Sequence, residues 1–333
     1  MYEFDKLCFE GGGIFGIAYI GALKYLEEQD LLRNVNAYSG TSSGSIIALM
    51  LALGYTNSEM YAFMESVKWD KLYDYNIGCF SFFPGYGLYK GNRLTKLYKD
   101  MIKKKTGSSY TTFKELYERT GKKLYVCAVN ATQQTTVYFN VDSHPHMELH
   151  MALRFSTSYP LVFKSLKYNG DYYVDGGVMD NYPIEAFECD KNVLGLKLLT
   201  NPKEDKKIDG MLDFTKHLFG AMMEGQEMAE SYPYVEKTVF IEMRSESLLT
   251  SVLDIGNSKN EFQFYHDTGY KAMQDFCEDY PRSVQHQMTV AHIEPDIHEA
   301  TSLPVEAVVS EQEPLEEVVD EEEYNNDVLH LEE

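Results

Sequence analysis

A run of glycines lies between an apolar segment and a helix-like segment near the start of the chain. Gly11-Gly12-Gly13 follows the apolar run Lys6–Glu10, and Gly16 opens a segment rich in Ile, Ala and Leu. Consecutive glycines let backbone N–H groups turn toward one point, where the amino end of a helix adds partial positive charge. Such a point stabilises an anion, either a phosphate or the oxyanion of an acyl-transfer transition state. A purely structural alternative is that the glycines permit close packing of helix on strand.

The spacing Gly11-x-Gly13-x-x-Gly16 also matches the dinucleotide-binding fingerprint. That fingerprint needs an acidic residue about 20 positions further on, which binds the ribose hydroxyls. Ala37, Tyr38 and Ser39 occupy those positions, and no Gly-Lys-Ser/Thr sequence follows the glycines. The residues therefore predict no nucleotide cofactor.

A second glycine-flanked segment carries a potential nucleophile. Gly40-Thr41-Ser42-Ser43-Gly44 fits the G-x-S-x-G pattern of a nucleophile elbow, between a predicted strand and a predicted apolar helix. In such a turn Gly40 and Gly44 prevent collisions with the strand and helix behind it, and Ser42 stands at the amino end of the helix. Ser43 and Ser45 are expected to cap and pack the helix start rather than to react.

A serine hydroxyl reacts only when a base removes its proton. None of the nine histidines lies in a glycine-flanked loop at the end of a predicted strand. Asp175 does, because the apolar strand that it ends continues with Gly176 and Gly177. A carboxylate in this position can reach a serine on a neighbouring strand and act as general base. A plain Asp-Gly turn is the alternative.

The elements that must position these groups alternate between strand and helix. Strand, glycine turn and helix occur twice within the first 54 residues, which predicts an α/β fold with a mainly parallel sheet. The predicted strands are Lys6–Glu10, Asn36–Ser39, Lys123–Asn130, Thr135–Asn140, Tyr172–Asp175, Asn192–Leu199 and Thr238–Met243. The predicted helices are Ile14–Glu28, Gly44–Leu53, Arg93–Lys105, Met211–Glu230 and Glu261–Glu278. No repeat or linker interrupts this region, so one catalytic domain over residues 1–292 is predicted.

Charge divides the chain into two parts. The 30 Lys+Arg and 52 Asp+Glu residues give a formal net charge of -22. Residues 294–333 hold fifteen of the acids and no Lys or Arg, which leaves 37 acids against 30 bases, a charge of -7, for the rest. The acids and prolines predict a disordered acidic tail over residues 293–333. The chain lacks the basic footprint of a nucleic-acid-binding protein, so nucleic acid is excluded as a partner.

Cysteine usage and hydropathy bear on the cellular compartment. The five cysteines are odd in number, widely spaced and without a CxxC pair, which predicts buried thiols rather than a disulfide framework or a metal site. No apolar run approaches the roughly 20 residues of a membrane span, and Met1–Glu10 is too charged for a signal peptide. We therefore expect a cytoplasmic protein that binds no metal and meets membranes only at their surface.

Together the three motifs resemble those of the patatin-like phospholipase family. The resemblance covers about Lys6 to Leu199 and extends through further segments, Leu88–Leu94, Thr112–Leu116, Arg154–Pro160 and Val178–Ile184. The family implies a three-layer α/β/α sandwich that hydrolyses lipid acyl esters with a serine/aspartate dyad and no metal. Carried over by position, Ser42 is the nucleophile, Asp175 is the base, and Gly11, Gly12 and Gly13 form the oxyanion hole.

Two segments depart from the family pattern. The family often has Arg or Lys where this chain has Phe15, which questions a preference for phospholipid headgroups but not ester hydrolysis. The family tends toward a smaller, Ala-rich stretch where this chain has Arg154-Phe155-Ser156-Thr157-Ser158.

An acyl lipid must reach the site from a membrane or micelle, which requires an apolar entrance. The irregular, aromatic segment Cys79–Tyr89 fits that role, and a basic helix follows it. We expect a membrane-facing surface that is formed by Phe80, Phe82, Phe83, Arg93, Lys96 and Lys99. A core-packed loop beside a solvated helix face is the alternative.

The leading prediction is a lipid acyl hydrolase of the phospholipase A or lysophospholipase type, with peripheral membrane contact. The alternatives are an acyltransferase or a non-specific esterase on the same dyad, or a non-catalytic lipid-binding protein that retains the fold.

Overall fold

The structure is a computed structural model that describes residues 4–72, 74, 87–187, 192–200, 232–243 and 259–278. All of these residues belong to one compact unit, Met1–Ala291. The strands are β1 (Lys6–Phe9), β2 (Ala37–Thr41), β3 (Gly87–Tyr89), β4 (Lys123–Asn130), β5 (Thr135–Phe139), β6 (Leu161–Phe163), β7 (Leu166–Tyr168), β8 (Asp171–Asp175), β9 (Val193–Thr200) and β10 (Thr238–Met243). The α-helices are α1 (Gly16–Glu28), α2 (Ser43–Ala52), α3 (Asn57–Ser66), α4 (Asn92–Thr106), α5 (Phe113–Thr120), α6 (Leu149–Ser156) and α9 (Lys259–Glu278). Short 3-10 helices are η1 (Gly13–Phe15), η2 (Trp69–Lys71), η3 (Gly176–Val178), η4 (Ile184–Phe187) and η5 (Tyr232–Lys237).

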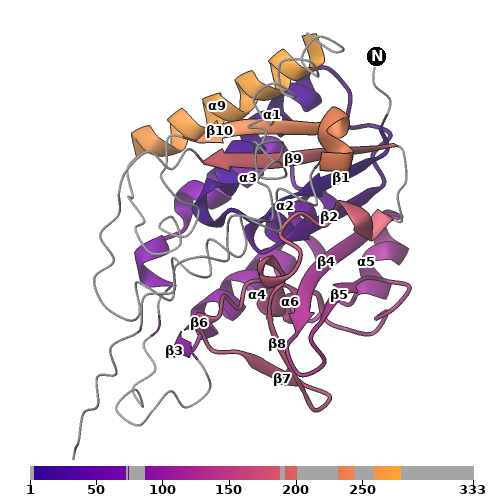
Figure 1. Ribbon diagram of the computed structural model, residues 1–333, viewed down its shortest axis with the longest axis vertical. Helices are drawn as coiled ribbons and strands as arrows, with labels where there is room; N and C mark the ends of the chain where they lie inside the picture. The colour runs from indigo at the N-terminus through magenta and orange to yellow at the C-terminus, as the bar shows by residue number, and fades with distance from the viewer. Residues whose placement is uncertain are drawn as a thin grey trace, which may run out of the picture. The chain divides into compact units, whose positions relative to one another are not determined.

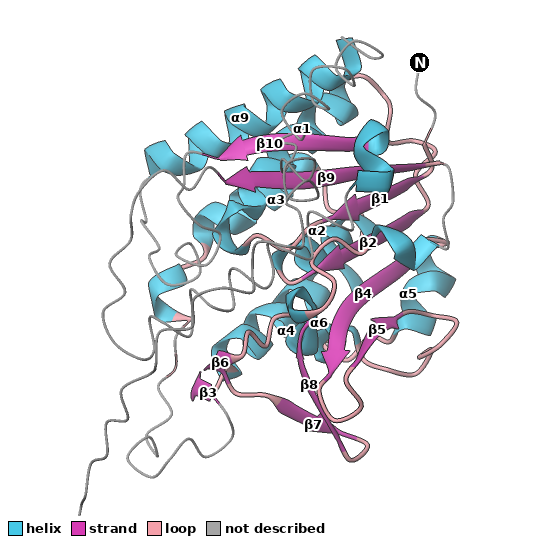
Figure 2. Ribbon diagram, in the orientation of Figure 1, coloured by secondary structure: helices cyan, strands magenta, loops and turns pink. Residues whose placement is uncertain are grey.

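One mainly parallel sheet forms the centre of the unit. Its order is β10-β9-β1-β2-β4-β8-β7, with β5 also paired to β4 (Figure 1). The five strands from β10 to β4 are parallel, whereas β5 and β8 run antiparallel to β4, and β7 to β8. The helices that connect β1 to β2 and β2 to β4 are the crossovers that parallel pairs require (Figure 2). The predicted α/β fold is confirmed.

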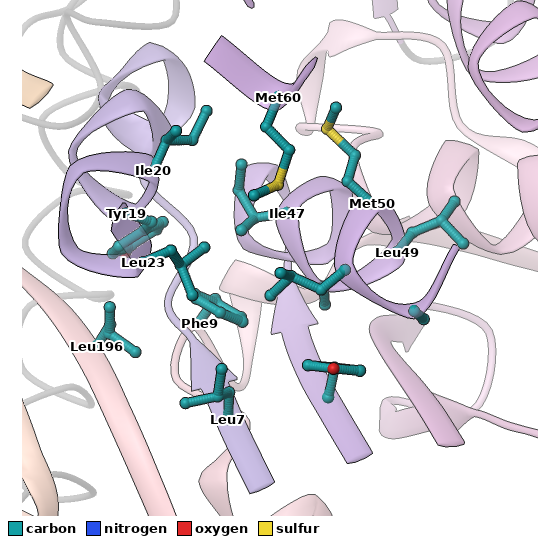
Figure 3. Packing of buried hydrophobic residues seen from close by; sticks show 14 of the residues in the cluster. Leu7, Phe9, Tyr19, Ile20, Leu23, Ile47, Leu49, Met50, Met60 and Leu196 are labelled. Carbon is teal, nitrogen blue, oxygen red and sulfur yellow. The ribbon is translucent and has the colours of Figure 1, made fainter. Parts of the chain in front are cut away.

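Both faces of the sheet are covered. Alternate residues of a strand point to opposite faces, and β1 shows this clearly. Leu7 and Phe9 join the large core beneath α1 and α2 (Figure 3), whereas Cys8 joins a second cluster with Tyr182 of the loop before η4 and Tyr234 of η5. A strand covered on both faces is apolar on both, which explains why Leu7, Cys8 and Phe9 form a continuous apolar run after the partly exposed Lys6.

Helix α9 packs across α1 and against β10. The two helices approach so closely that side chains are excluded at the crossing. A Cβ atom added at Gly21 would lie 1.8 Å from the His266 carbonyl oxygen, and one at Gly269 would lie 1.8 Å from the Ala18 carbonyl oxygen. Helix α9 therefore covers α1, the helix of the first βα unit.

Most predicted elements are confirmed to within one or two residues. The predicted helix Met211–Glu230, the tail over residues 293–333, and Cys79 and Cys189 lie outside the described residues. Among those described, no helix is long and apolar enough to cross a membrane. Cys8 and Cys127 are buried free thiols, and Cys277 is a partly buried one.

Candidate active site

Ser42 stands on a strained turn between β2 and α2. Its backbone angles are φ 51° and ψ -122°, in a region that costs a non-glycine residue about 1–3 kcal/mol. The flanking glycines make the turn possible. A Cβ atom at Gly40 would lie 2.4 Å from the Gly44 carbonyl carbon, and one at Gly44 would lie 2.3 Å from the Phe9 carbonyl oxygen. The turn thus has the geometry of a nucleophile elbow.

The register of the sheet brings Asp175 to the level of Ser42. Strand β4 lies between their strands, with Thr41 opposite Cys127 on one side and Asp175 opposite Ala128 on the other. Ser42 follows Thr41, so both side chains lie at the Cys127–Ala128 level of the central strand. The sequence predicts neighbouring strands for the two residues, whereas in the structure β4 separates the strands and its register with β2 and β8 brings the residues to one level.

Asp175 is a buried carboxylate whose side chain is only partly satisfied. The residue is 2% exposed, and its Oδ1 accepts a hydrogen bond from the Gly177 N–H at 2.9 Å. Burial raises the pKa of Asp175 to about 7, although the Gly177 N–H and the Ser42 hydroxyl lower it. Its Oδ2 nevertheless makes no hydrogen bond of good geometry with the described residues. The Ser42 hydroxyl therefore lies near this carboxylate without a hydrogen bond of good geometry to it.

Two of the three N–H groups of the glycine loop donate to acceptors among the described residues. Gly11 donates to the Asn181 carbonyl oxygen at 3.0 Å, and Gly12 donates to Ser43 Oγ at 2.9 Å. Gly13, with φ 56°, donates its N–H to no acceptor within the described ranges. Gly11 and Gly12 thus hold the loop, and Gly13 has the N–H that an anion could use.

Asn181, for which the sequence predicts no role, connects the glycine loop to the segment that follows Asp175. Its carbonyl oxygen accepts from Gly11, and its Nδ2 donates to the Gly11 carbonyl oxygen at 3.1 Å. Both backbone groups of Gly11 are therefore held by a residue six positions after Asp175. The segment Val178–Ile184 did carry the family resemblance, but the contact spans 170 positions of sequence and has no local signal.

A buried ion pair and an aromatic contact support the same loop from behind. Lys197 Nζ donates to Glu10 Oε1 at 2.6 Å, and the Leu198 N–H donates to Glu10 Oε2 at 2.7 Å. These bonds fix the end of β1 to β9 just before the glycines. Phe15 is buried, and its ring packs edge-on against Tyr265 of α9 with centroids 4.9 Å apart. The position where the family often has a cation is thus part of the core.

The remaining predicted site residues lie in three places. Gly16 begins α1, where an added Cβ would make only ordinary contacts at 3.7 Å, and Gly176 lies against Cys127. On α4, Arg93 donates to the Lys71 carbonyl oxygen, Lys96 pairs with Asp100, and Lys99 lies over the Tyr110 ring. Phe80, Phe82 and Phe83 lie outside the described residues.

In the described part of the chain, neither a histidine nor a metal-binding cluster lies beside Ser42 and Asp175. His144, His146, His150 and His266 make no hydrogen bond to Ser42 or Asp175. No group of three or more His, Cys, Asp or Glu residues there could hold a metal ion. Asp175 is accordingly the titratable group that the described residues bring to Ser42.

Comparison with known proteins places the chain in a family. Residues 7–188, more than half of the chain, match the family model described as patatin-like phospholipase. The chain belongs to the patatin-like phospholipase family. Membership assigns this patatin-like protein to the lipid hydrolases and confirms the resemblance inferred from the motifs.

Individual relatives agree with this assignment. The probable lipid hydrolase 463L of Invertebrate iridescent virus 6 is 32% identical over 217 residues, 64% of this chain and 70% of that protein. The uncharacterized protein R571 of Acanthamoeba polyphaga mimivirus is 27% identical over 82% of this chain and 93% of its own length. Among solved structures, VipD of Legionella pneumophila matches with a TM-score of 0.60 and 17% identity over 83% of this chain and 67% of its own. This last similarity concerns the fold.

Proposed function

We propose that this patatin-like protein is a serine esterase that cleaves carboxylic esters of membrane lipids, with Ser42 as nucleophile and Asp175 as general base. One observation carries the proposal: a serine on a strained turn lies beside a buried carboxylate whose pKa is about 7. A base with a pKa near the working pH is ionised often enough to accept a proton and basic enough to remove one. Such perturbed groups concentrate at functional sites.

The proposed reaction has two halves. In the first, Asp175 takes the proton from Ser42 Oγ while that oxygen attacks the ester carbonyl carbon. The Gly13 N–H, with the amino end of α2, stabilises the resulting oxyanion, and the alcohol part leaves with the proton from Asp175. In the second half, Asp175 takes a proton from a water molecule that attacks the acyl carbonyl carbon. The bond to Ser42 Oγ then breaks, Oγ takes the proton back from Asp175, and the fatty acid is released.

The substrate class follows from family and site together. We infer phospholipids or lysophospholipids as substrates, attacked as by a phospholipase A or a lysophospholipase. Phe15 carries no charge, and its ring is buried against Tyr265, so this position offers nothing that binds a phosphate. We therefore expect the acyl ester, rather than the headgroup, to dominate recognition.

Covalent labelling and product analysis test this proposal in one experiment. The protein is incubated with phosphatidylcholine vesicles, with lysophosphatidylcholine and with a soluble p-nitrophenyl ester, and a fluorophosphonate probe is then used to label it. We expect release of fatty acid and a single labelled peptide that contains Ser42. Acyl groups found on added alcohol instead of water would identify an acyltransferase, and labelling elsewhere than Ser42 would refute the assignment of the nucleophile.

We also propose that the segment around Phe82 and helix α4 form the membrane-facing surface. The exposed side chains of Arg93 and Lys96 lie on the first two turns of this helix, and Leu94 and Tyr98 on its other face are buried. Cations beside an aromatic segment suit the interface of an anionic membrane.

Vesicle sedimentation tests this surface. The double variant Phe82→Ala/Phe83→Ala is expected to bind phosphatidylglycerol vesicles about tenfold more weakly than the parent, because two apolar anchors are lost. Its hydrolysis of a soluble ester is expected to stay at the parent rate. Replacement of the exposed Tyr117 on α5 by Ala serves as the control. Unchanged sedimentation of the double variant would contradict the proposed surface.

A further inference from the structure

One short segment at the end of α6 contacts the backbone of both proposed catalytic residues. The Ser42 N–H donates to Ser156 Oγ at 2.9 Å. The Asp175 N–H donates to the Ser158 carbonyl oxygen at 3.0 Å. Ser156 and Ser158 are fully buried, so no water competes for these bonds. The two residues that must exchange a proton are thus held by groups only two positions apart.

Arg154 fixes that segment to the rest of the fold. Its guanidinium donates to Ser158 Oγ at 2.7 Å, to the Lys90 carbonyl oxygen at 3.1 Å and to the Lys164 carbonyl oxygen at 3.4 Å. The side chain is 1% exposed and has no carboxylate within ion-pair distance in the described part of the chain. Three hydrogen bonds to neutral oxygens and the Phe163 ring, whose centroid lies 5.6 Å from the guanidinium carbon, offset the cost of burying this cation. Arg154 therefore defines one position for the end of α6.

The chain is shaped around this guanidinium at Gly91. Its φ is 72°, and an added Cβ atom would lie 2.0 Å from Arg154 Nη2. A side chain at this position would displace the guanidinium. The backbone between β3 and α4 therefore leaves space for the Arg154 guanidinium, and we infer that this contact is a specific one.

We propose that the segment Arg154–Ser158 sets the separation of Ser42 and Asp175, with Ser156 and Arg154 as positioning residues. The inference rests on the proposed function, since it concerns the same dyad. Ser156 holds the Ser42 turn, and Ser158 holds the end of β8. Arg154 prevents the segment from shifting. The hydroxyl of Ser156 and the guanidinium of Arg154 thus act on proton transfer without touching the substrate.

The variant Ser156→Ala tests this role, because it removes one acceptor and adds no bulk. Hydrolysis of a soluble ester is measured to separate kcat from KM. We expect kcat to fall about 10- to 100-fold, since small displacements of catalytic groups cost that much, while KM stays within about twofold. Ser165→Ala is the matched control, because Ser165 is also buried but its Oγ makes no hydrogen bond to the described residues. It is expected to keep the parent kcat.

The same substitution in an Asp175→Asn background separates positioning from a general loss of stability. Residues that act through one another are non-additive, so Ser156→Ala is expected to cost less than about threefold when the base is already absent. Arg154→Lys, which keeps the charge but not the planar fork, is expected to lower kcat in the same way. A parent-like kcat for Ser156→Ala, an equal loss in Ser165→Ala, or an equal factor in both backgrounds would each overturn the proposal.

A crystal structure of Ser156→Ala gives a readout that does not depend on turnover. We expect the Ser42 backbone to relax from its strained φ toward an ordinary value once its N–H loses the acceptor. An unchanged Ser42 turn would overturn the positioning role even if the parent hydrolysed no ester. Failure of the proposed function is instead detected by the absence of turnover and of labelling at Ser42.

Discussion

Replacement of Ser42 by Ala is expected to lower kcat on any ester substrate by about 10⁴-fold or more, because no acyl-enzyme can then form. The rate that remains reflects substrate binding and oxyanion stabilisation alone. Alanine adopts the strained Ser42 backbone as well as serine does, so we expect the fold and KM to be retained. Steady-state kinetics on a soluble ester measure the effect.

Ser66→Ala provides the control for this experiment. Ser66 ends α3, and its hydroxyl donates only to the Phe63 carbonyl oxygen on an exposed surface. The same chemical change there is expected to leave kcat unaltered. Turnover by Ser42→Ala within about tenfold of the parent would show that another group attacks the ester.

Asp175→Asn is expected to lower kcat by about 10²- to 10⁴-fold, the usual contribution of a general base. The parent should also lose activity as pH falls through about 7, because the carboxylate is then protonated. Asparagine cannot titrate, so the residual activity of the variant should not show that midpoint. The pH dependence of kcat for both proteins measures this, and a midpoint near 7 that persists in the variant would assign the titration to another group.

The same substitution is expected to stabilise the protein at high pH. The folded-state pKa of Asp175, about 7, lies above that of an unfolded carboxyl, about 3.9, so the folded protein binds this proton more tightly. The resulting contribution to the free energy of unfolding is complete below about pH 4 and is lost as pH rises through about 7. The Tm of Asp175→Asn relative to the parent should therefore increase from about pH 5 to about pH 8. Asp30→Asn, on an exposed turn, should show no such trend.

The sequence predicts those parts of the fold where the signal is local. Glycines separate β1 from α1 and β2 from α2 sharply, so these units were found almost to the residue. Helices α3 and α5 were missed, although each begins with a capping box, Thr56 with Glu59 and Thr112 with Glu115. Helix α6 has no side-chain cap at Glu148 and is too short to show a clear hydrophobic period, so its sequence contains no clear signal for a helix.

The site residues, too, can be predicted only where the sequence signal is local. Ser42 and Asp175 could be proposed from local sequence, because Gly40 and Gly44 flank the Ser42 turn and two glycines follow Asp175. The position of β4 between their strands could not be predicted, because which strands pair depends on the packing of the whole sheet. The hydrogen bond from the Ser42 N–H to Ser156 Oγ joins residues 114 positions apart, so only the folded structure shows that the end of α6 contacts the Ser42 turn. A serine that accepts one backbone hydrogen bond has no composition or spacing that distinguishes it from others.

The crossing of α1 and α9 determines how much of the chain is needed to make a stable protein. The family match ends at residue 188, before β9, β10 and α9. A protein cut at that point would expose the edge of β1 that β9 pairs with, and the face of α1 around Gly21 that α9 covers. Unpaired strand edges and uncovered apolar helix faces promote aggregation. The smallest fragment expected to express as a stable protein therefore extends through Glu278, well past the end of the family-model match.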